Sequence, residues 1–301
     1  MKLESLFSNK KKKIGKDGKK YQKLVDYFVK HLHRTQTPDL DFPEDRILTF
    51  LHSGNSGDII YSLPCVLAIA KAQKADLLLK TNRPAGYASF IDHPMGNVTL
   101  DEKTAKMLVP LLAYQDFIRN VSIGDAATDA VDVNLDLIRD YPLLLDRGNI
   151  ARWYFQAFGV NYDLNKNWLT APKDNGASDA IVVARSLRYH SPEIDYSFLS
   201  RYPNVQFVGL ENEFGQMRTA IPDLQYRPIK DFLELASIIN GSRLFIGNQS
   251  FPFSIAEGLK VNRMLEVHFE CPNVTVYGDK GYDFCFQPQF EKIVKERYEF
   301  L

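Results

Sequence analysis

The chain has 301 residues, 45% of them hydrophobic and 25% charged, and its 37 basic and 37 acidic residues give a formal net charge of zero. This balance excludes the strong overall field of a protein that binds nucleic acid or membranes through its whole surface, and no apolar run approaches the roughly 20 residues of a membrane-spanning helix. The length favours two domains, and the N-terminus has no apolar stretch typical of a signal peptide, so we expect a cytoplasmic protein.

Residues 1–43 are predicted to form a basic tail followed by a helix. Seven lysines fall between Lys10 and Lys20, which is typical of a solvated tail. The alternative is a weak contact with an anionic surface, lipid headgroups or nucleic acid, and a lipid contact would place the protein at the periphery of a membrane. Apolar residues recur at helical spacing over 21–33 and predict a short amphipathic helix packed on the body.

A front domain is predicted over residues 44–170, where apolar strands alternate with helical patterns. The first unit reads strand, helix, strand over 46–79, and such a βαβ unit implies a parallel sheet. We expect Pro64 to fall in the first turn of the helix, where proline is tolerated. Further along this half we expect helices over 103–113 and 135–147 and short strands over 117–123 and 130–134.

A linker rich in Pro, Gly, Asn and Asp over 169–179 is expected to precede a back domain over residues 179–301. In this half the patterns predict strands over 180–184, 205–209, 243–246 and 263–267, helices over 232–239 and 254–260, and a closing helix over 290–298. The fold class that follows is α/β, with two Rossmann-like, doubly wound domains that face a cleft. Ligands of such sheets bind at the carboxyl ends of the strands.

The first predicted strand runs into a glycine loop, Gly54-Asn55-Ser56-Gly57, that precedes a helix. Glycine lets a ligand approach the main chain, and the helix start presents free N–H groups to an anion. The loop is not a Walker A loop, since no Gly-Lys-Ser/Thr follows, and it is not a complete dinucleotide fingerprint. Asp58 puts a negative charge where a phosphate would sit, so the pattern indicates either a helix-capping residue or a base.

Two motifs resemble the heptosyltransferase-like, family 9-type glycosyltransferases, which have the GT-B fold. The stretch from Gly57 to Pro64, GDIIYSLP, is similar to the family signature of Gly-Asp, two apolar residues, any residue, Ser or Thr, and Leu-Pro. In the second half, residues 231–236, 244–250 and 256–259 resemble the family's helix followed by an apolar strand and "D-[ST]-G-x-x-H-x-A". The motifs come in the family's order and cover both halves of the chain.

The second motif departs from the family at three positions. Asn248 stands where the family has Asp, Ser250 where it has Gly, and Phe253 where it has His. These differences predict a different sugar nucleotide, or a diphosphate that is held differently. They also keep open a chain that binds a ligand without turning it over.

The resemblance implies a transferase that moves a sugar from a nucleotide-diphosphate sugar to an acceptor hydroxyl, with inversion and with Asp58 as the general base. The expected acceptor is a surface glycan or a lipid-linked saccharide, and a modified nucleic-acid base is a further alternative. A positioned carboxylate typically accelerates such a step by roughly 10²–10⁴-fold. No metal-ligand spacing is visible, so we expect no metal and no cofactor, and the diphosphate must meet cationic side chains and helix N-termini.

Candidate donor-binding residues follow the strands of the back domain. Arg185 and Arg188 come directly after the strand over 180–184, and the forked guanidinium suits phosphate oxygens. The alternative is a pair of surface arginines. Asn248, Gln249 and Ser250 follow the strand over 243–246 and precede a helix, so they either cradle phosphate or cap that helix.

Acidic and acceptor-side candidates complete the site. Glu257 lies one turn into the helix over 254–260, where it either accepts ribose hydroxyls, as the likeness to GT-B enzymes implies, or favours the helix dipole. Glu213 follows the strand over 205–209 as a further donor contact, against a solvated loop. Weaker acceptor candidates are His52, at the end of the first strand, and Asp92 and His93, in the loop after the second strand.

Three functions stay open at this point. A metal-independent glycosyltransferase is the first prediction. A GT-B-fold protein that binds a ligand without catalysis is the second, and the three departures favour it. A nucleotide-sugar epimerase of similar fold is the third.

Overall fold

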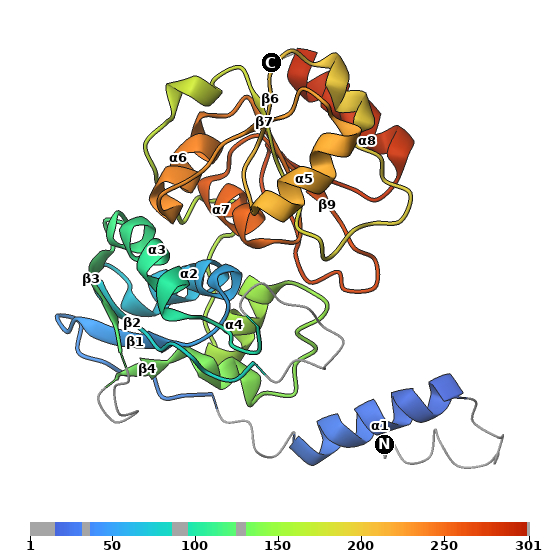
Figure 1. Ribbon diagram of the computed structural model, residues 1–301. Helices are drawn as coiled ribbons and strands as arrows, with labels where there is room; N and C mark the ends of the chain where they lie inside the picture. The colour runs from blue at the N-terminus through green and yellow to red at the C-terminus, as the bar shows by residue number, and fades with distance from the viewer. Residues whose placement is uncertain (1–15, 32–36, 86–95, 125–130, 300–301) are drawn as a thin grey trace.

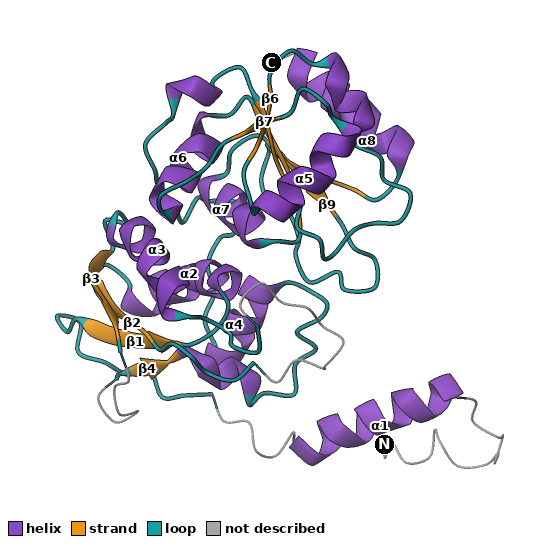
Figure 2. Cartoon of the chain, in the orientation of Figure 1, coloured by secondary structure: helices purple, strands orange, loops and turns teal. Residues whose placement is uncertain are grey.

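The computed structural model describes residues 16–31, 37–85, 96–124 and 131–299. The described chain forms two α/β lobes and a separate helix, α1 (Lys16–His31), which lies apart from both (Figure 1, Figure 2). We call the lobe built on the N-terminal sheet the front lobe and the lobe built on the C-terminal sheet the back lobe. No described helix is both long and apolar enough to cross a lipid bilayer.

The front lobe contains a parallel sheet with strand order β3-β2-β1-β4. Its strands are β1 (Leu48–His52), β2 (Ala75–Leu79), β3 (Ile118–Ile123) and β4 (Val133–Asn134). Its helices are α2 (Ser56–Ala70), α3 (Glu102–Ala113), the 3₁₀ turn η3 (Leu135–Arg139) and α4 (Ile150–Phe158).

The back lobe contains a parallel sheet with strand order β10-β9-β8-β5-β6-β7. Its strands are β5 (Ile181–Ala184), β6 (Val205–Phe207), β7 (Gln225–Tyr226), β8 (Leu244–Asn248), β9 (Arg263–Glu266) and β10 (Gly281–Phe284). Its helical elements are η4 (Asn175–Ala177), η5 (Ser197–Arg201), α5 (Glu211–Ala220), α6 (Phe232–Gly241), α7 (Phe251–Leu259) and α8 (Gln287–Glu299).

Each sheet has a point at which the winding of the chain reverses. In the front lobe the chain moves outward from β1 to β3 and then returns to place β4 on the other side of β1. In the back lobe it moves from β5 to β7 and returns to place β8 beside β5. Ligands of open parallel sheets bind at such switch points, outside the carboxyl ends of the strands. A ligand is therefore expected near the loops after β1, β4, β5 and β8.

The two lobes share a continuous apolar core. Helix α2 of the front lobe packs on α7 of the back lobe, and α3 packs on α6. One cluster of buried side chains includes Ile60 of α2, Phe253 of α7 and Trp168 of the connecting segment. Burial on both sides explains why α2 is apolar around most of its circumference instead of along one stripe.

The Trp168 side chain donates a hydrogen bond to a carbonyl of α2 that has no donor within the helix. Pro64 lies inside this helix, beyond the first turn in which we expected it. Proline has no N–H, so it leaves the carbonyl of Ile60, four residues earlier, without its helical donor. The indole Nε1–H of Trp168 donates to that carbonyl at 3.1 Å, and both residues are buried. A side chain of the interlobe connection thus completes a helix of the front lobe.

Gly258 lets the same connection lie against α7. Its carbonyl accepts hydrogen bonds from the N–H groups of Trp168 and Leu169, at 3.0 and 3.1 Å. A Cβ at this position would come within 2.8 Å of the Leu169 side chain. Glycine is therefore required here by the close approach of the connecting segment.

The sequence located most of the strands and missed several helices. The predicted strand over 75–79 is confirmed as β2, and the strands over 46–51, 117–123, 180–184, 243–246 and 263–267 are confirmed to within two residues at each end. The predicted helix over 135–147 is wrong, because only η3 forms there and a turn region follows. Helices α4 and α5 and strands β7 and β10 were not predicted. The helix over 21–33 exists as α1, but the expectation that it packs on the body is wrong.

We predict that Pro64 and Trp168 are energetically coupled. Trp168→Phe should lower the free energy of unfolding by about 1–3 kcal/mol, because it leaves the buried Ile60 carbonyl without a donor. In a Pro64→Ala background the new N–H of residue 64 can donate to that carbonyl, so the same substitution should cost clearly less. Urea unfolding of the two single variants and the double variant measures the difference. An equal cost in both backgrounds would contradict this account of the hydrogen bond.

Candidate functional site

The front half of the site is the loop between β1 and α2, at the switch point of the front sheet. The N–H of Ser53 donates to Asp136 Oδ1 at 3.0 Å, and its hydroxyl donates to the other oxygen of the same carboxylate. The Thr99 hydroxyl donates to the Ser53 carbonyl. Asp136 follows β4, so this carboxylate joins the ends of the two strands that flank the switch point.

Asp58 lies in the first turn of α2 with 29% of its side chain exposed. Its carboxylate accepts a hydrogen bond from the N–H of Asn55, the N-cap residue, and Arg139 Nη2 lies 4.0 Å from its Oδ2. Burial raises the pKa of Asp58, and Arg139 is the largest influence that opposes this increase. The residue therefore caps the helix and also keeps a partly exposed, weakly acidic carboxyl group at the switch point.

Two arginines of the front lobe, which the sequence analysis missed, surround Asp58 and Asp136. Arg139 Nη1 donates to Asp136 at 2.6 Å, and Arg83 Nη1 lies 3.0 Å from the same carboxylate. Arg83 also donates to the Ser53 hydroxyl at 3.1 Å. Arg139 is the last residue of η3, inside the segment that we expected to be a longer helix.

His52 is a structural residue, and the prediction that it contacts an acceptor is wrong. It is 2% exposed, its Nδ1 accepts the N–H of Gly54 at 2.8 Å, and its Nε2 lies 2.7 Å from the Tyr154 hydroxyl. Burial lowers the pKa of His52 to about 3. The ring is thus neutral, with its proton on Nε2, and both nitrogens are occupied by the protein.

Gly54 is required by the groups around it. A Cβ at this position would lie 2.5 Å from the His52 ring and 2.6 Å from Arg139 Nη2. The histidine ring is buried and cannot move aside. Gly57 is different, because a Cβ there would make only ordinary contact, 3.9 Å from Cα of Phe251 and 4.0 Å from Ser254 Oγ. The start of α2 therefore faces the start of α7 across the two lobes.

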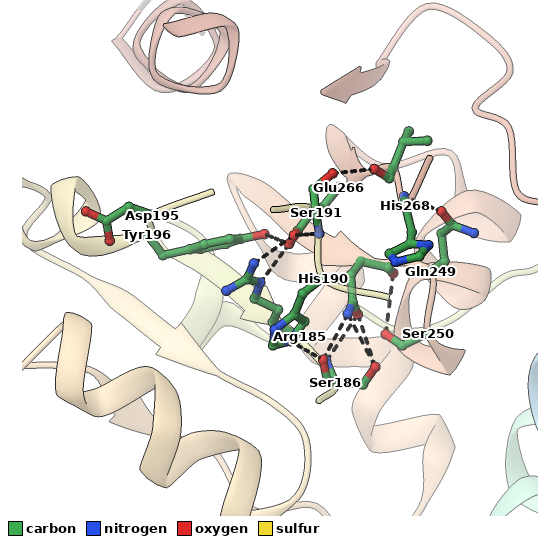
Figure 3. A network of polar contacts seen from close by, with 12 residues as sticks. Arg185, Ser186, His190, Ser191, Asp195, Tyr196, Gln249, Ser250, Glu266 and His268 are labelled. Carbon is green, nitrogen blue, oxygen red and sulfur yellow. Dashed lines mark hydrogen bonds and ion pairs between the residues drawn. The ribbon is translucent and has the colours of Figure 1, made fainter. Parts of the chain in front are cut away.

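Arg185, directly after β5 in the back half of the site, forms an ion pair with Glu266. Its Nε and Nη2 donate to the two oxygens of Glu266, both at 2.7 Å, and its guanidinium lies 4.6 Å from the centre of the Tyr196 ring (Figure 3). Glu266 is fully buried and also accepts from the Tyr196 hydroxyl and the Ser191 N–H. The expectation of an arginine available to phosphate is therefore not supported for Arg185.

Asn248 fixes the loop that follows β5. Its Oδ1 accepts the N–H of Ser186 at 3.1 Å, while its Nδ2 donates to the carbonyls of Ser186, at 3.0 Å, and Arg188, at 2.5 Å. The residue is fully buried. Only an amide can accept and donate in this way, because an aspartate has no donor when ionised. This explains in physical terms why Asn, and not the Asp of the family motif, suits this chain.

Gln249 and Ser250 also make hydrogen bonds to other groups of the protein (Figure 3). Gln249 Oε1 accepts the N–H of His268 at 2.6 Å, and its Nε2 donates to the Cys271 carbonyl at 2.6 Å and to Asn273 Oδ1 at 2.8 Å. The Ser250 hydroxyl donates to the Asn248 carbonyl at 3.4 Å. These contacts do not support the expected phosphate contacts of the two side chains.

The N-terminus of α7 offers few donors to an anion. Pro252 lies in its first turn and has no N–H. The N–H of Phe253 donates back to the Ser250 carbonyl at 3.0 Å. The Phe253 side chain, at the position of the family's histidine, is fully buried in the core. The phosphate cradle expected at this helix is thus largely closed by the chain itself.

The two candidate glutamates have structural partners. Glu257 is 1% exposed, pairs with Lys260 and with Arg263 Nε at 2.6 Å, and accepts the Tyr277 N–H at 3.1 Å, so the expected ribose contact is contradicted by its burial. Glu213 accepts the N–H groups of Leu210 and Leu187 and so caps α5 and holds the loop after β5.

Arg188 is the candidate that faces the front lobe. It is half-buried, and its guanidinium lies 5.3 Å from the centre of the Tyr189 ring. Its charge lowers the pKa of Asp58 in the front lobe and of Glu213 in the back lobe, against the increase that burial causes in both. Of the effects on the pKa of Asp58, that of Arg188 is the smallest, and it is the one that comes from the back lobe.

The remaining predictions concern metals and the acceptor loop. Asp92 and His93 lie outside the described residues. Within the described ranges, no three His, Cys, Asp or Glu side chains gather in a group that could hold a metal ion.

Comparison with known proteins supports the fold. No protein-family model and no curated protein matches the chain. Among solved structures, a family 9 glycosyl transferase from Veillonella parvula matches with a TM-score of 0.51 and 13% identity, over 86% of this chain and 91% of that chain. The E. coli heptosyltransferase WaaC, solved with ADP-2-deoxy-2-fluoro heptose, matches with a TM-score of 0.53 and 9% identity, over 83% of this chain and 99% of that chain. The expected GT-B architecture is therefore confirmed as a fold.

We predict that His52 makes the protein less stable in mild acid. The unfolded chain binds a proton at this position below about pH 6.5, whereas the folded chain resists protonation until about pH 3. The stabilisation is complete above the higher value and is lost as the pH falls toward the lower one. From about pH 7 to pH 5 this residue should remove about 2 kcal/mol from the free energy of unfolding.

Two variants distinguish the protonation of His52 from the loss of its hydrogen bond to Tyr154. His52→Gln should remove most of this pH dependence, whereas Tyr154→Phe deletes the same hydrogen bond, leaves the histidine in place and should keep it. Denaturant unfolding at both pH values gives the comparison. If the two variants show the same pH dependence, another group is responsible.

We also predict that restoring the family's aspartate will destabilise the chain. Asn248→Asp removes two donated hydrogen bonds and places a buried carboxylate against two carbonyl oxygens, which should cost about 3 kcal/mol at neutral pH. Asn212→Asp, at an exposed position of α5, is the matched control and should change the stability by no more than about 0.5 kcal/mol. A stable Asn248→Asp variant would show that the amide is not needed to hold the loop.

Proposed function

We propose that this protein is a glycosyltransferase that moves a sugar from a nucleotide-diphosphate sugar to a hydroxyl of a saccharide. The observation that carries the proposal is the place of Asp58, in the first turn of α2 at the front switch point and next to Gly57, which faces the start of α7 in the back lobe. The charge of Arg188 reaches Asp58 from the back lobe. The fold supports it, because the two solved structures reported above are a heptosyltransferase and a family 9 glycosyl transferase.

Asp58 has the properties of a general base in this reaction. An acceptor hydroxyl is a poor nucleophile until a positioned base takes its proton. Burial raises the pKa of Asp58, which strengthens the carboxylate as a base, and Arg139 limits that increase. Direct attack of the activated hydroxyl on the anomeric carbon would invert its configuration. No step of this scheme uses a metal ion or a cofactor.

The leaving nucleotide diphosphate needs positive charge at the same cleft. Arg188 supplies it from the back lobe, and the N–H groups in the first turn of α2 supply partial positive charge from the front lobe. Arg185, Asn248 and Gln249 hold the loops around this point and are positioning residues in the proposal. WaaC was solved with an ADP-linked sugar, so ADP-linked sugars are the first donors to test.

A ligand-binding protein without turnover is the second candidate function. The observation in its favour is the back-lobe loop itself, in which Asn248, Gln249 and Phe253 occupy the family motif with contacts to the protein. Such a protein would bind the nucleotide through Arg188 and leave Asp58 without a reaction to catalyse.

We predict that Asp58→Asn abolishes transfer without loss of donor binding. The amide keeps the shape of the carboxylate and can still accept the Asn55 N–H, but it cannot take a proton, so turnover should fall by roughly 10²–10⁴-fold. The assay measures nucleotide-diphosphate release and sugar transfer from a panel of nucleotide sugars. Asp76→Asn is the matched control, because Asp76 pairs with Arg119 in the same lobe near the amino end of β2.

Donor binding is measured separately by thermal stability. A specific donor at about 100 times its Kd should stabilise the fold by about 2.7 kcal/mol in both the wild type and Asp58→Asn. Stabilisation with no turnover by the wild type would favour the second candidate function. Turnover that survives Asp58→Asn would overturn the assigned base.

A further inference from the structure

Helix α1 presents two opposite faces of different chemistry. At about 100° per residue, Tyr21, Leu24, Val25, Phe28 and Val29 fall in one arc of the helix. The five lysines of the helix fall on the other side of it, within an arc of roughly 100° that also contains Tyr27. Exposed side chains on this face include Lys19, Lys20, Lys23 and Lys30. A narrow basic face opposite a broad apolar face is the pattern of a helix that lies in a membrane interface.

The described body of the protein does not cover the apolar face. None of the main contacts between described elements involves α1, and neither buried apolar cluster includes a residue of this helix. Tyr21 and Val29 remain 69% and 56% exposed. Figure 1 shows the helix apart from both lobes. An isolated helix of this length is marginal in water, and Gly18 weakens it further, so a second surface is needed to stabilise it.

The charge of the lysine face selects among the surfaces that could cover α1. Nucleic acid would pair with the lysines and leave the apolar arc in water. A second copy of the helix would cover the apolar arc but would leave the lysines in water, where they outnumber the acidic residues of the helix by five to two. An anionic bilayer satisfies both faces. When the apolar arc enters the interface by about 5–10 Å, the opposite side of a helix about 10 Å wide lies at the level of the headgroups.

We propose that α1 binds the surface of an anionic lipid bilayer, with its apolar arc inserted and its lysines among the headgroup phosphates. The proposal rests on the helix alone and does not depend on the activity of the two lobes. It places the protein at the membrane surface.

Vesicle flotation with the full-length protein tests the proposal. The protein should float with vesicles made of equal parts of phosphatidylcholine and phosphatidylglycerol, and should remain unbound with phosphatidylcholine alone. Lys19→Gln/Lys20→Gln/Lys23→Gln should weaken binding to the anionic vesicles by roughly 100-fold, since each lysine near such a surface contributes about fivefold. Leu24→Gln/Phe28→Gln should weaken it by a factor on the order of 100 through lost insertion.

The matched control removes three exposed lysines from the lobes. Lys74→Gln/Lys166→Gln/Lys295→Gln has the same change in net charge and should bind as the wild type does. Thermal unfolding of each variant checks that the lobes remain folded. Equal losses in the two lysine variants would overturn the assignment to α1, because they would show a response to net charge alone.

Three other results would also overturn the proposal. The first is no binding of the wild type to anionic vesicles. The second is binding that survives Leu24→Gln/Phe28→Gln, because the apolar arc would then not be inserted. The third is a mass in solution of twice 34.4 kDa that Leu24→Gln/Phe28→Gln reduces to a monomer, because a second copy would then cover the apolar arc.

Discussion

The packing of α2 on α7 holds the two lobes in one orientation, and the proposed site exists only in that orientation. Asp58 lies in the first turn of α2, on the front-lobe side of this contact, and the loop that carries Arg188 belongs to the back lobe. The Trp168 indole strengthens the contact, because it supplies the N–H that Pro64 cannot give to the Ile60 carbonyl. Pro64 therefore leaves a helix carbonyl without its usual donor, and Trp168 of the interlobe connection donates a hydrogen bond to it instead.

The two switch points are built differently. The front one is held by charge. Asp136 accepts hydrogen bonds from Ser53 and pairs with Arg83 and Arg139 near the end of β1, and Arg139 Nη2 lies 4.0 Å from Asp58. The back one is held by the buried ion pair of Arg185 and Glu266, which is neutral as a pair, and by the amides of Asn248 and Gln249, which bond to main-chain groups of the loops beside them. An amide frame fixes loop position without adding charge, so the charge offered to a donor at this point comes mainly from Arg188.

The sequence predicted most of the strands from local apolar runs, and the place of Asp58 from the glycine loop after the first of them. It failed where a role depends on partners distant in the chain. Nothing local distinguishes Arg185, which pairs with Glu266, from Arg188, whose charge reaches Asp58. Glu257 was expected either to accept ribose hydroxyls or to favour the helix dipole, yet it is buried and paired with Arg263 inside the core. Arg139 was missed because the turn after η3 was interpreted as a continuing helix.

The link between Arg188 and Asp58 has a consequence for the proposed reaction. Arg188, whose influence on the pKa of Asp58 is the smallest, stabilises the ionised form of Asp58 and so weakens it as a base. A donor diphosphate bound to Arg188 would offset that positive charge and bring negative charge of its own near Asp58. Both effects raise the pKa of the carboxyl group. The base would therefore become stronger when the donor is in place, which is when a proton has to be removed from the acceptor hydroxyl.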